Sequence, residues 1–426
     1  MIKRFSPNDF LDEDDPTWAR FDGEVGYTLG RYLPRDGIDG SWTISTARDN
    51  GQRTSWMYND RPSRINTYGN SFTQCHQVSD GETWQEYLAA HLGEPVRNFG
   101  MVWPIGQAPG RIHERALRSR EIWLQVAPAA GIWCEAVGSL HLAYRQDEWE
   151  VLQEFGARDL GYEVELLDFS GVMARTGAVR ADGLLGGMWS PTELCIDPRE
   201  AIARLPEWLA EEHGVTLRFG TRVTAVEVPC VKTARESWQV DRVAICTGAD
   251  FEGLFPDIYA ASGLTRCKLQ MMRTRPQPGG WRLGPHLAAG LSLRHYAAFE
   301  SCGSLQALRD RVKDETPDFD RWGIHVMASQ TGIGEITIGD SHEYGDDITP
   351  FDRGEIDALI LDYLCGFLVA PDLRIAERWH GVYAKHPEES DFVADVAPGV
   401  KIVNGVGGAG MTTSFGLAEE VFDAWT

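Results

Sequence analysis

The C-terminal end of the sequence places a strand, a glycine-rich loop and a helix in direct succession. Val400–Asn404 has the apolar character of a buried strand, and Thr412–Trp425 carries the apolar stripe of a helix. Between them, Gly405 to Gly410 reads GVGGAG and fits the pattern GxGxxG. A loop that leads into a helix N-terminus presents bare N–H groups to an anion. Only sixteen residues follow Gly410, so we expect no complete dinucleotide-binding unit here.

The composition of the chain argues against several classes of binding partner. The 426 residues include 40 Lys and Arg against 63 Asp and Glu, a net charge of −23, which argues against nucleic acid and anionic membranes. No apolar run approaches the length of a membrane span. The eight cysteines form no CxxC pair and the eleven histidines no HExxH motif. We expect a cytoplasmic protein with reduced thiols, no metal site and a small-molecule substrate. The oligomeric state is not predicted.

The middle of the chain mixes helices with strands of both kinds. The periodicity predicts helices over Arg111–Gln125 and Ala201–His213, the second ended by Gly214. The predicted strands are Val215–Phe219, Thr221–Val228, Val240–Cys246, Lys268–Thr274, Gly323–Ser329 and Glu335–Gly339. The last three suit an antiparallel sheet. The fold class is therefore mixed α/β, with a Rossmann-like sheet that is incomplete and a separate antiparallel sheet.

Residues 1–60 give no assignable pattern, but residues 61–100 predict a βαβ unit. Ile65–Tyr68 and Pro95–Phe99 are its strands, with a helix between them that ends at Gly93. Ser71 stands on the turn after the first strand. This stretch resembles the nucleophile block of SGNH hydrolases, with Asn70 where that family has an aspartate. The family's other blocks are absent after Gly100, so Ser71 is an ordinary turn serine or, alternatively, the nucleophile of a serine esterase.

A second triplet of the same kind, Gly339-Asp340-Ser341, follows an alternating strand. No helix with a core stripe comes directly after it. We therefore interpret it as the end of a strand in an antiparallel sheet and not as a nucleophile.

From Arg97 to Thr426 the chain resembles the D-amino-acid-oxidase type (DAO) family of FAD-dependent oxidoreductases, and within it a phosphonate-associated subfamily. The stretches that carry the resemblance include RNFGMVWPIGQAPG, DRVAICTGADFEGLFP, RWGIHVMASQ, ERWHGVYAKHP and GAGMTTSFGLAEEV. The resemblance implies FAD as cofactor and residues 101–426 as an oxidoreductase with interleaved FAD-binding and substrate subdomains. It implies oxidation of a C–N bond in a small amine, with hydride passing to the flavin.

The resemblance also implies which residues form the site. The implied cofactor contacts are Asn98, Gly100, Met101, Val223, Thr247, Gly248, Gly405, Gly407, Gly408, Gly410, Met411 and Thr412. The implied substrate pocket contains Tyr383, His325 and His342, with Lys385 and His386 as further candidates. Family members that oxidise amino acids carry an arginine where this chain has Tyr383. An amine with another anionic group, such as an aminophosphonate, therefore fits better than a simple amino acid.

The family's N-terminal βαβ unit, which holds the ADP half of FAD, is missing. No GxGxxG occurs in the first 96 residues. The simplest account is a fusion at VRNFG, with the hydrolase-like unit in place of the nucleotide-binding one. Two outcomes stay open: the unit Ile65–Phe99 fills the gap and FAD binds weakly, or the sheet lacks its central strands and the fusion product is unstable and inactive.

Overall fold

The computed structural model describes residues 19–22, 26–29, 99–346 and 348–425. The chain divides into two units, Met1–Pro95 and Val96–Thr426. In the first unit, β1 (Ala19–Asp22) and β2 (Gly26–Leu29) form an antiparallel hairpin. The predicted βαβ unit and Ser71 lie outside the described residues.

A nine-stranded sheet dominates the second unit. Its order is β17-β13-β16-β15-β14-β5-β7-β6, and β18 pairs with β13 off this path. All its pairs are antiparallel except β14 with β5. The strands are β5 (Ser139–Ala143), β6 (Glu165–Asp168), β7 (Gly186–Ser190), β13 (Thr265–Thr274), β14 (His286–Ala288), β15 (Met327–Gln330), β16 (Ile336–Gly339), β17 (Glu343–Gly345) and β18 (Ile375–Lys385).

The predicted antiparallel sheet is confirmed, because β13, β15 and β16 pair in the expected sense. Strand β15 begins at Met327, later than the predicted Gly323. The reason is that Gly323 has a φ of +54° and leads a turn, which a strand cannot accommodate. The Gly339-Asp340-Ser341 triplet lies at the end of β16, as predicted for a strand end.

A smaller sheet carries the C-terminal strand. β12 (Val243–Ile245) runs parallel to β20 (Val400–Asn404). β19 (Phe392–Ala397) pairs with the other edge of β20 in the antiparallel sense. The predicted bounds of β20 are confirmed, whereas β12 is shorter than predicted. Within the described ranges this sheet has three strands. The mixed α/β fold class is confirmed.

One predicted strand is wrong. Residues 215–219 form no strand, although their apolar residues suggested one. Gly214 ends α6 in the left-handed conformation, and Gly220 turns the chain again at a φ of +64°. The stretch between these turns exposes Phe219 and therefore has no core to bury it. The strand predicted over Thr221–Val228 forms as β9 (Val223–Glu227), which pairs with β10 (Cys230–Thr233), itself paired with β11 (Ser237–Gln239).

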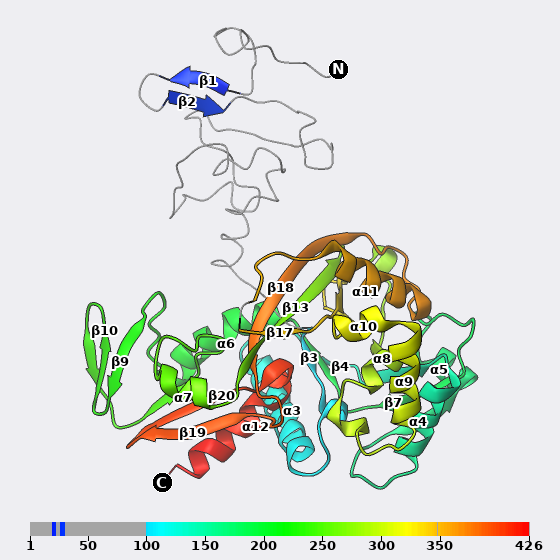
Figure 1. Ribbon diagram of the computed structural model, residues 1–426, viewed down its shortest axis with the longest axis horizontal. Coiled ribbons are helices and arrows are strands. Elements are labelled where there is room, and N and C mark those ends of the chain that lie inside the picture. The colour runs from blue at the N-terminus through cyan, green and yellow to red at the C-terminus, as the bar shows by residue number, and fades with distance from the viewer. Residues whose placement is uncertain (1–18, 23–25, 30–98, 347, 426) are drawn as a thin grey trace. The chain divides into compact units, whose positions relative to one another are not determined.

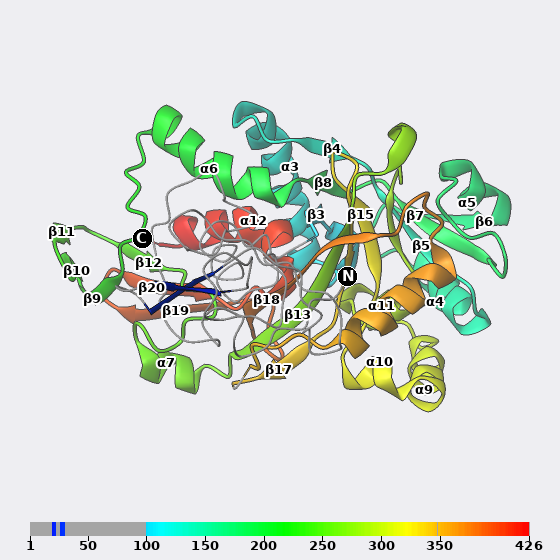
Figure 2. The same cartoon turned by 90° about the horizontal axis from the view of Figure 1, so that it is seen from above.

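Helices cover the sheets, as Figures 1 and 2 show. α3 and α12 pack side by side, and both predicted helices of the middle region form, as α3 and α6. The helices are α3 (Arg111–Ala129), α4 (Gln146–Gly156), α5 (Phe169–Arg175), α6 (Pro198–His213), α7 (Pro256–Ala261), α8 (Gly290–Leu293), α9 (Leu305–Glu315), α10 (Pro317–Arg321), α11 (Gly354–Phe367) and α12 (Gly410–Asp423). Within the described ranges, no helix is long and apolar enough to cross a membrane.

A third sheet connects the start of the second unit to the helices. β3 (Met101–Val102) and β4 (Cys134–Ala136) both pair with β8 (Leu194–Ile196). Short 3-10 turns η3 (Pro104–Gly106), η4 (Pro278–Gly280), η5 (Ala297–Phe299) and η6 (Gly407–Ala409) complete the described elements. The seven cysteines among the described residues are free thiols, as expected.

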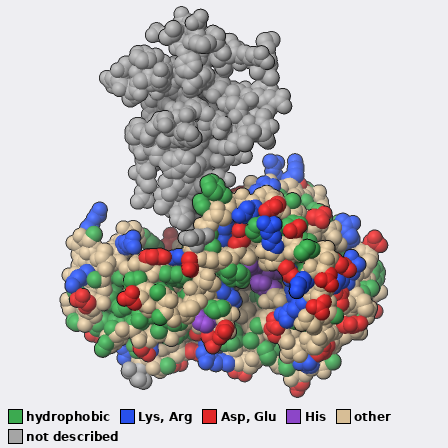
Figure 3. Space-filling view, viewed as in Figure 1, with side chains coloured by type: hydrophobic (Ala, Val, Ile, Leu, Met, Phe, Trp, Pro, Cys, Tyr) green, Lys and Arg blue, Asp and Glu red, His purple; other side chains and the backbone are tan. Residues whose placement is uncertain are grey.

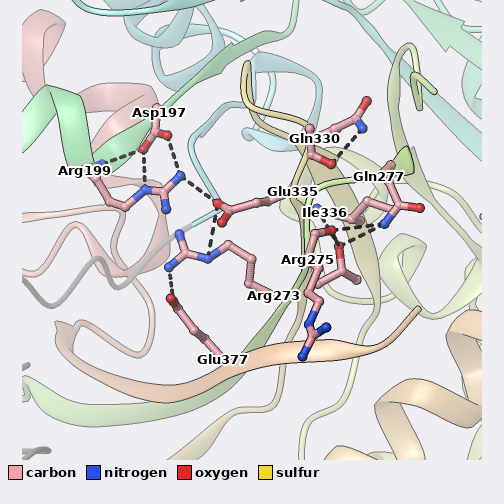
Figure 4. A network of polar contacts seen from close by, with 11 residues as sticks. Asp197, Arg199, Arg273, Arg275, Gln277, Gln330, Glu335, Ile336 and Glu377 are labelled. Carbon is pink, nitrogen blue, oxygen red and sulfur yellow. Dashed lines mark hydrogen bonds and ion pairs between the residues drawn. The ribbon is translucent and has the colours of Figure 1, made fainter. Parts of the chain in front are cut away.

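A chain of ion pairs holds the start of α6 to the large sheet (Figure 4). Arg199 lies 2.7 Å from Asp197 and 2.8 Å from Glu335, which precedes β16. Arg273 in β13 pairs with Glu335 at 3.6 Å and with Glu377 in β18. Because Asp197 and Glu335 are mostly buried, these contacts are screened less than surface pairs and fix the elements that surround the site.

Candidate functional site

The glycine-rich loop after β20 leads into α12 with a backbone that only glycine adopts readily. Gly405 has a φ of +75°, and a Cβ there would lie 2.7 Å from Leu264. Gly407 has a φ of +58°, and its Cβ would lie 2.9 Å from Cδ of Lys385. The residue before α12, Ala409, provides no side-chain cap. The first N–H groups of the helix are therefore available to a ligand, and the helix dipole places positive potential there.

This loop opens on a cavity of about 500 Å³. Figure 3 shows a hollow with histidine side chains on this face of the molecule. The loop and the start of α12 line it together with the end of β18, which forms a β-bridge to the loop between Lys385 and Val406. Further lining comes from the segment that carries β3 and η3, which includes Phe99, Met101 and Trp103. The walls therefore combine apolar side chains with many polar and titratable ones.

The cavity brings together most of the predicted site residues. Those that line it are Met101, Gly407, Gly408, Gly410, Met411 and Thr412 from the cofactor set, and His325, His342, Tyr383 and Lys385 from the substrate set. The described residues that do not line it are Gly100, Val223, Thr247, Gly248, Gly405 and His386. Asn98 and Ser71 lie outside the described residues. Nδ1 of His386 accepts backbone hydrogen bonds from Glu388 and Glu389, so this ring fixes a turn.

Thr247 and Gly248 lie at the carboxyl end of β12, beside the start of the glycine-rich loop. Asn404, the last residue of β20, donates to the carbonyl oxygen of Gly248 at 2.9 Å and accepts from the N–H of Gly405 at 2.8 Å. The Thr247 hydroxyl is 2.8 Å from that of Tyr259. Asn404 was missed from the sequence, although an asparagine that ends an apolar strand was a visible signal. It holds two predicted cofactor segments together.

Two more predicted residues fix the segment that carries β3 and η3. The backbone N–H of Trp103 donates to the hydroxyl of Thr412 at 2.9 Å, which joins η3 to the start of α12. Gly100 has a φ of +73°, and a Cβ there would lie 2.0 Å from the carbonyl oxygen of Ile196. This close approach sets β3 against β8. Val223 instead begins β9 and packs in the small core around β12 and β20.

Three histidines stack at one end of the cavity: His295, between α8 and η5, His325, before β15, and His342, after β16. Ring centroids are 3.9 Å apart for His295 and His325 and 4.5 Å for His295 and His342. For His325 and His342 the separation is 5.2 Å. The ring planes make angles of 22° for His295 with His325 and 21° for His325 with His342, which are stacked, and 39° for His295 with His342, which are tilted.

A hydrogen bond positions one of these rings, and a contact with a carboxylate positions a second. Nδ1 of His342 donates to the carbonyl oxygen of Gly323 at 2.9 Å. Nε2 of His325 lies 2.9 Å from the buried carboxylate of Asp340. Burial is the main cause that lowers the pKa of His342, and the Asp340 carboxylate opposes it. His295 and Asp340 were missed as site residues, because both stand in short loops where no periodicity marks them.

Two groups on β18 face the glycine-rich loop. The hydroxyl of Tyr383 lies 3.5 Å from the position that a Cβ on Gly408 would take. Burial raises the pKa of Tyr383 well above 10.0, so its phenol stays protonated at neutral pH. Burial also lowers the pKa of Lys385. The site thus offers a neutral hydroxyl donor beside an amine.

A glycine-rich loop that leads from a parallel strand pair into a helix N-terminus suits an anionic cofactor, and the cavity beside it has room for a small substrate. The chain belongs to the DAO family, FAD-dependent oxidoreductases, whose family model matches residues 88–424. The predicted cofactor, FAD, is therefore the cofactor that this family uses. The match begins before Arg97, inside the segment predicted to resemble SGNH hydrolases.

Solved structures support the same fold. Glycine oxidase from Geobacillus kaustophilus matches with a TM-score of 0.60 and 15% identity, over 77% of this chain and 84% of that one. L-proline dehydrogenase from P. horikoshii matches with a TM-score of 0.57 and 19% identity, over 75% of this chain and 80% of that one. FAD-bound L-alpha-glycerophosphate oxidase from Mycoplasma pneumoniae matches with a TM-score of 0.57 and 15% identity, over 78% of this chain and 84% of that one. No curated protein sequence matches significantly.

Proposed function

We propose that this chain oxidises the C–N bond of a small amine that carries an anionic group, with FAD bound along the glycine-rich loop. The observation that carries the proposal is the cavity of about 500 Å³ between that loop and the end of β18. One of its walls suits a flavin and the other presents polar groups. Two of the structural neighbours, glycine oxidase and L-proline dehydrogenase, are named for amine substrates.

The residues on the page fit the flavin end of FAD. The loop from Gly405 to Gly410 carries only two side chains, those of Val406 and Ala409, and Met101 adds an apolar surface. The N-terminus of α12 offers positive potential at this wall, through Met411 and Thr412. When bound, FAD accepts a hydride and so supplies the redox chemistry. The protein's own contribution is to orient the amine and to stabilise negative charge beside α12.

We infer that this chain holds the ADP half of FAD less firmly than the flavin half. Thr247, Gly248 and Gly100 do not line the cavity, and we propose them as backbone contacts of the ADP half. Val223, at the start of β9, is a further candidate. The sequence before Arg97 contains no glycine-rich phosphate loop. We therefore propose reversible FAD binding and retain the proposal that residues 61–100 derive from an SGNH hydrolase joined by gene fusion.

The substrate wall favours an amine other than a simple α-amino acid. No arginine lines the cavity among the residues that the structure describes, so the bidentate clamp for a carboxylate is missing there. Tyr383 instead presents a neutral hydroxyl, and Lys385 with the histidines offers point-like donors. An aminophosphonate, which carries a dianionic group beside its amine, suits this set.

The test is anaerobic bleaching of the flavin by candidate amines, with the full chain and saturating FAD. The wild-type chain is expected to bleach the flavin with an aminophosphonate faster than with glycine. Gly408→Leu, which places a side chain in the cavity, should abolish bleaching. Gly366→Leu is the matched control, because Gly366 lies in α11 with no atom within 4 Å of its Cβ position. Equal bleaching by both variants, or none by any amine with the wild type, would refute the proposal.

A further inference from the structure

The spacing of the histidine stack at first suggests a metal centre. One nitrogen from each of His295, His325 and His342 lies within 4.8 Å of the others. A metal ion bound by imidazole must, however, lie close to the plane of each ring. With the rings of His295 and His325 stacked 3.9 Å apart at 22°, no point lies in both planes near both nitrogens. The stack as it stands is therefore not built for a shared metal.

The ring of His295 is the open member of the stack. Its side chain is exposed, because it faces the cavity, although it lies deep in the protein. It makes no side-chain hydrogen bond to any other residue of the described part. His325 and His342 are already engaged by Asp340 and Gly323. A ligand in the cavity would thus find a free imidazole at His295.

We propose that the histidine stack and Lys385 bind a tetrahedral dianion carried by the substrate, and that the stack takes up one proton from solvent as it binds. This inference rests on the proposed function, since it specifies the group that the substrate carries beside its amine. A planar carboxylate is matched best by the fork of an arginine, which the described lining lacks. The free imidazole of His295 and the amine of Lys385 stand on separate segments, which suits an anion with oxygens in several directions.

The charges around the stack explain why a proton should arrive with the anion. Lys385 and Arg294 act on His295 as cations, and Asp340 is the nearest carboxylate to the stack. The other titratable groups that line the cavity are Glu388, Glu389, Tyr296, Tyr344 and Tyr383. Desolvation, followed by the neighbouring cations and rings, holds the pKa of His295 well below 6.5. Without a ligand, this ring is therefore neutral near pH 7.

A bound dianion reverses this balance. Its charge favours the imidazolium form, so the pKa of the stack rises on binding and a proton is taken up. The sign follows directly: affinity for the dianion is strongest at low pH and falls as pH rises through the pKa of the occupied state. A monoanion would give a weaker version of the same effect.

Sulfate is the appropriate probe, because it stays a dianion near neutral pH and any proton taken up then belongs to the protein. Calorimetric titration of the full chain in two buffers of different ionisation enthalpy gives both affinity and proton uptake. Saturable binding with uptake of about one proton is expected for the wild type. His295→Gln should abolish the uptake and weaken binding about tenfold. Lys385→Met should weaken binding and keep the uptake.

The control is His213→Gln, since His213 is an exposed histidine at the end of α6. It should bind sulfate as the wild type does, and circular dichroism establishes that each variant is folded. The inference is overturned if folded wild-type protein binds no sulfate, if acetate binds as well as sulfate, or if His295→Gln takes up the same proton. Because the titration needs neither FAD nor turnover, sulfate binding without flavin reduction would refute only the proposed oxidation.

Discussion

Among single residues, Glu193 is the most deeply placed charge next to the site. Its side chain is fully buried, and its carboxylate accepts from the N–H of Ile105 at 3.2 Å. It also accepts from the hydroxyls of Thr192 at 2.7 Å and Ser139 at 2.9 Å. These bonds join η3, β5 and β8, so one side chain holds the segment that carries Trp103 into the cavity.

Two substitutions of Glu193 should separate the effect of its hydrogen bonds on stability from the effect of its charge. Glu193→Gln keeps the acceptor for Ile105 and can donate to the Ser139 hydroxyl, so we expect stability within about 1 kcal/mol of the wild type at pH 7. Glu193→Ala leaves the donors unpaired and should lose about 3 kcal/mol. Urea titration of both variants measures this. Equal losses would mean that the charge itself is required.

The pH dependence has a definite sign. Burial raises the pKa of Glu193 above 4.5, so its ionisation disfavours the folded state as pH rises from that value. Glu193→Gln cannot ionise, and its stability relative to the wild type should therefore increase from about pH 4.5 upward. A constant difference across this range would contradict that explanation.

Between elements, the contact of α3 with α12 positions the glycine-rich loop. Gly416 lets the helices approach closely, because a Cβ there would lie 2.6 Å from the carbonyl oxygen of Arg115. The N–H of Gly416 donates to the hydroxyl of Ser119 at 2.8 Å. The guanidinium of Arg115 binds both oxygens of Glu420, at 2.8 and 2.7 Å. Contacts with α3 along the middle and end of α12 thus hold this helix, and with it the loop that precedes it.

Two glycine-to-alanine changes test this packing. Gly416→Ala forces the backbones apart and should lower the free energy of unfolding by about 2 kcal/mol. Gly366→Ala has open space in α11 and should be neutral or stabilise by up to about 1 kcal/mol, because alanine is the better helix former. Thermal unfolding distinguishes them. If Gly416→Ala melts at or above the temperature of Gly366→Ala, the close approach does not matter.

The same scale shows what the sequence could predict. Strand β20 and the helix after it were predicted because period and glycine punctuation agree there. Residues 215–219 were predicted wrongly, because apolar residues alone do not supply a pairing partner. His295 and Asp340 could not be predicted, because only the pairing of β15 with β16 and the path after α8 bring their loops together.

At the scale of the whole molecule, the second unit has a large core around the nine-stranded sheet and a smaller core around β12 and β20. The family match over residues 88–424 covers nearly all of this unit. The cavity lies where the glycine-rich loop of the smaller sheet meets the end of β18.

The most direct test of the central claim is the difference spectrum of FAD on addition of the purified full chain. The account predicts a saturable change in the visible bands with one FAD per chain, and loss of the change on dilution, because the 96 residues before Arg97 contain no GxGxxG. A folded chain that leaves the FAD spectrum unchanged, even when protein is in excess, would contradict the assignment of the cavity as a flavin site.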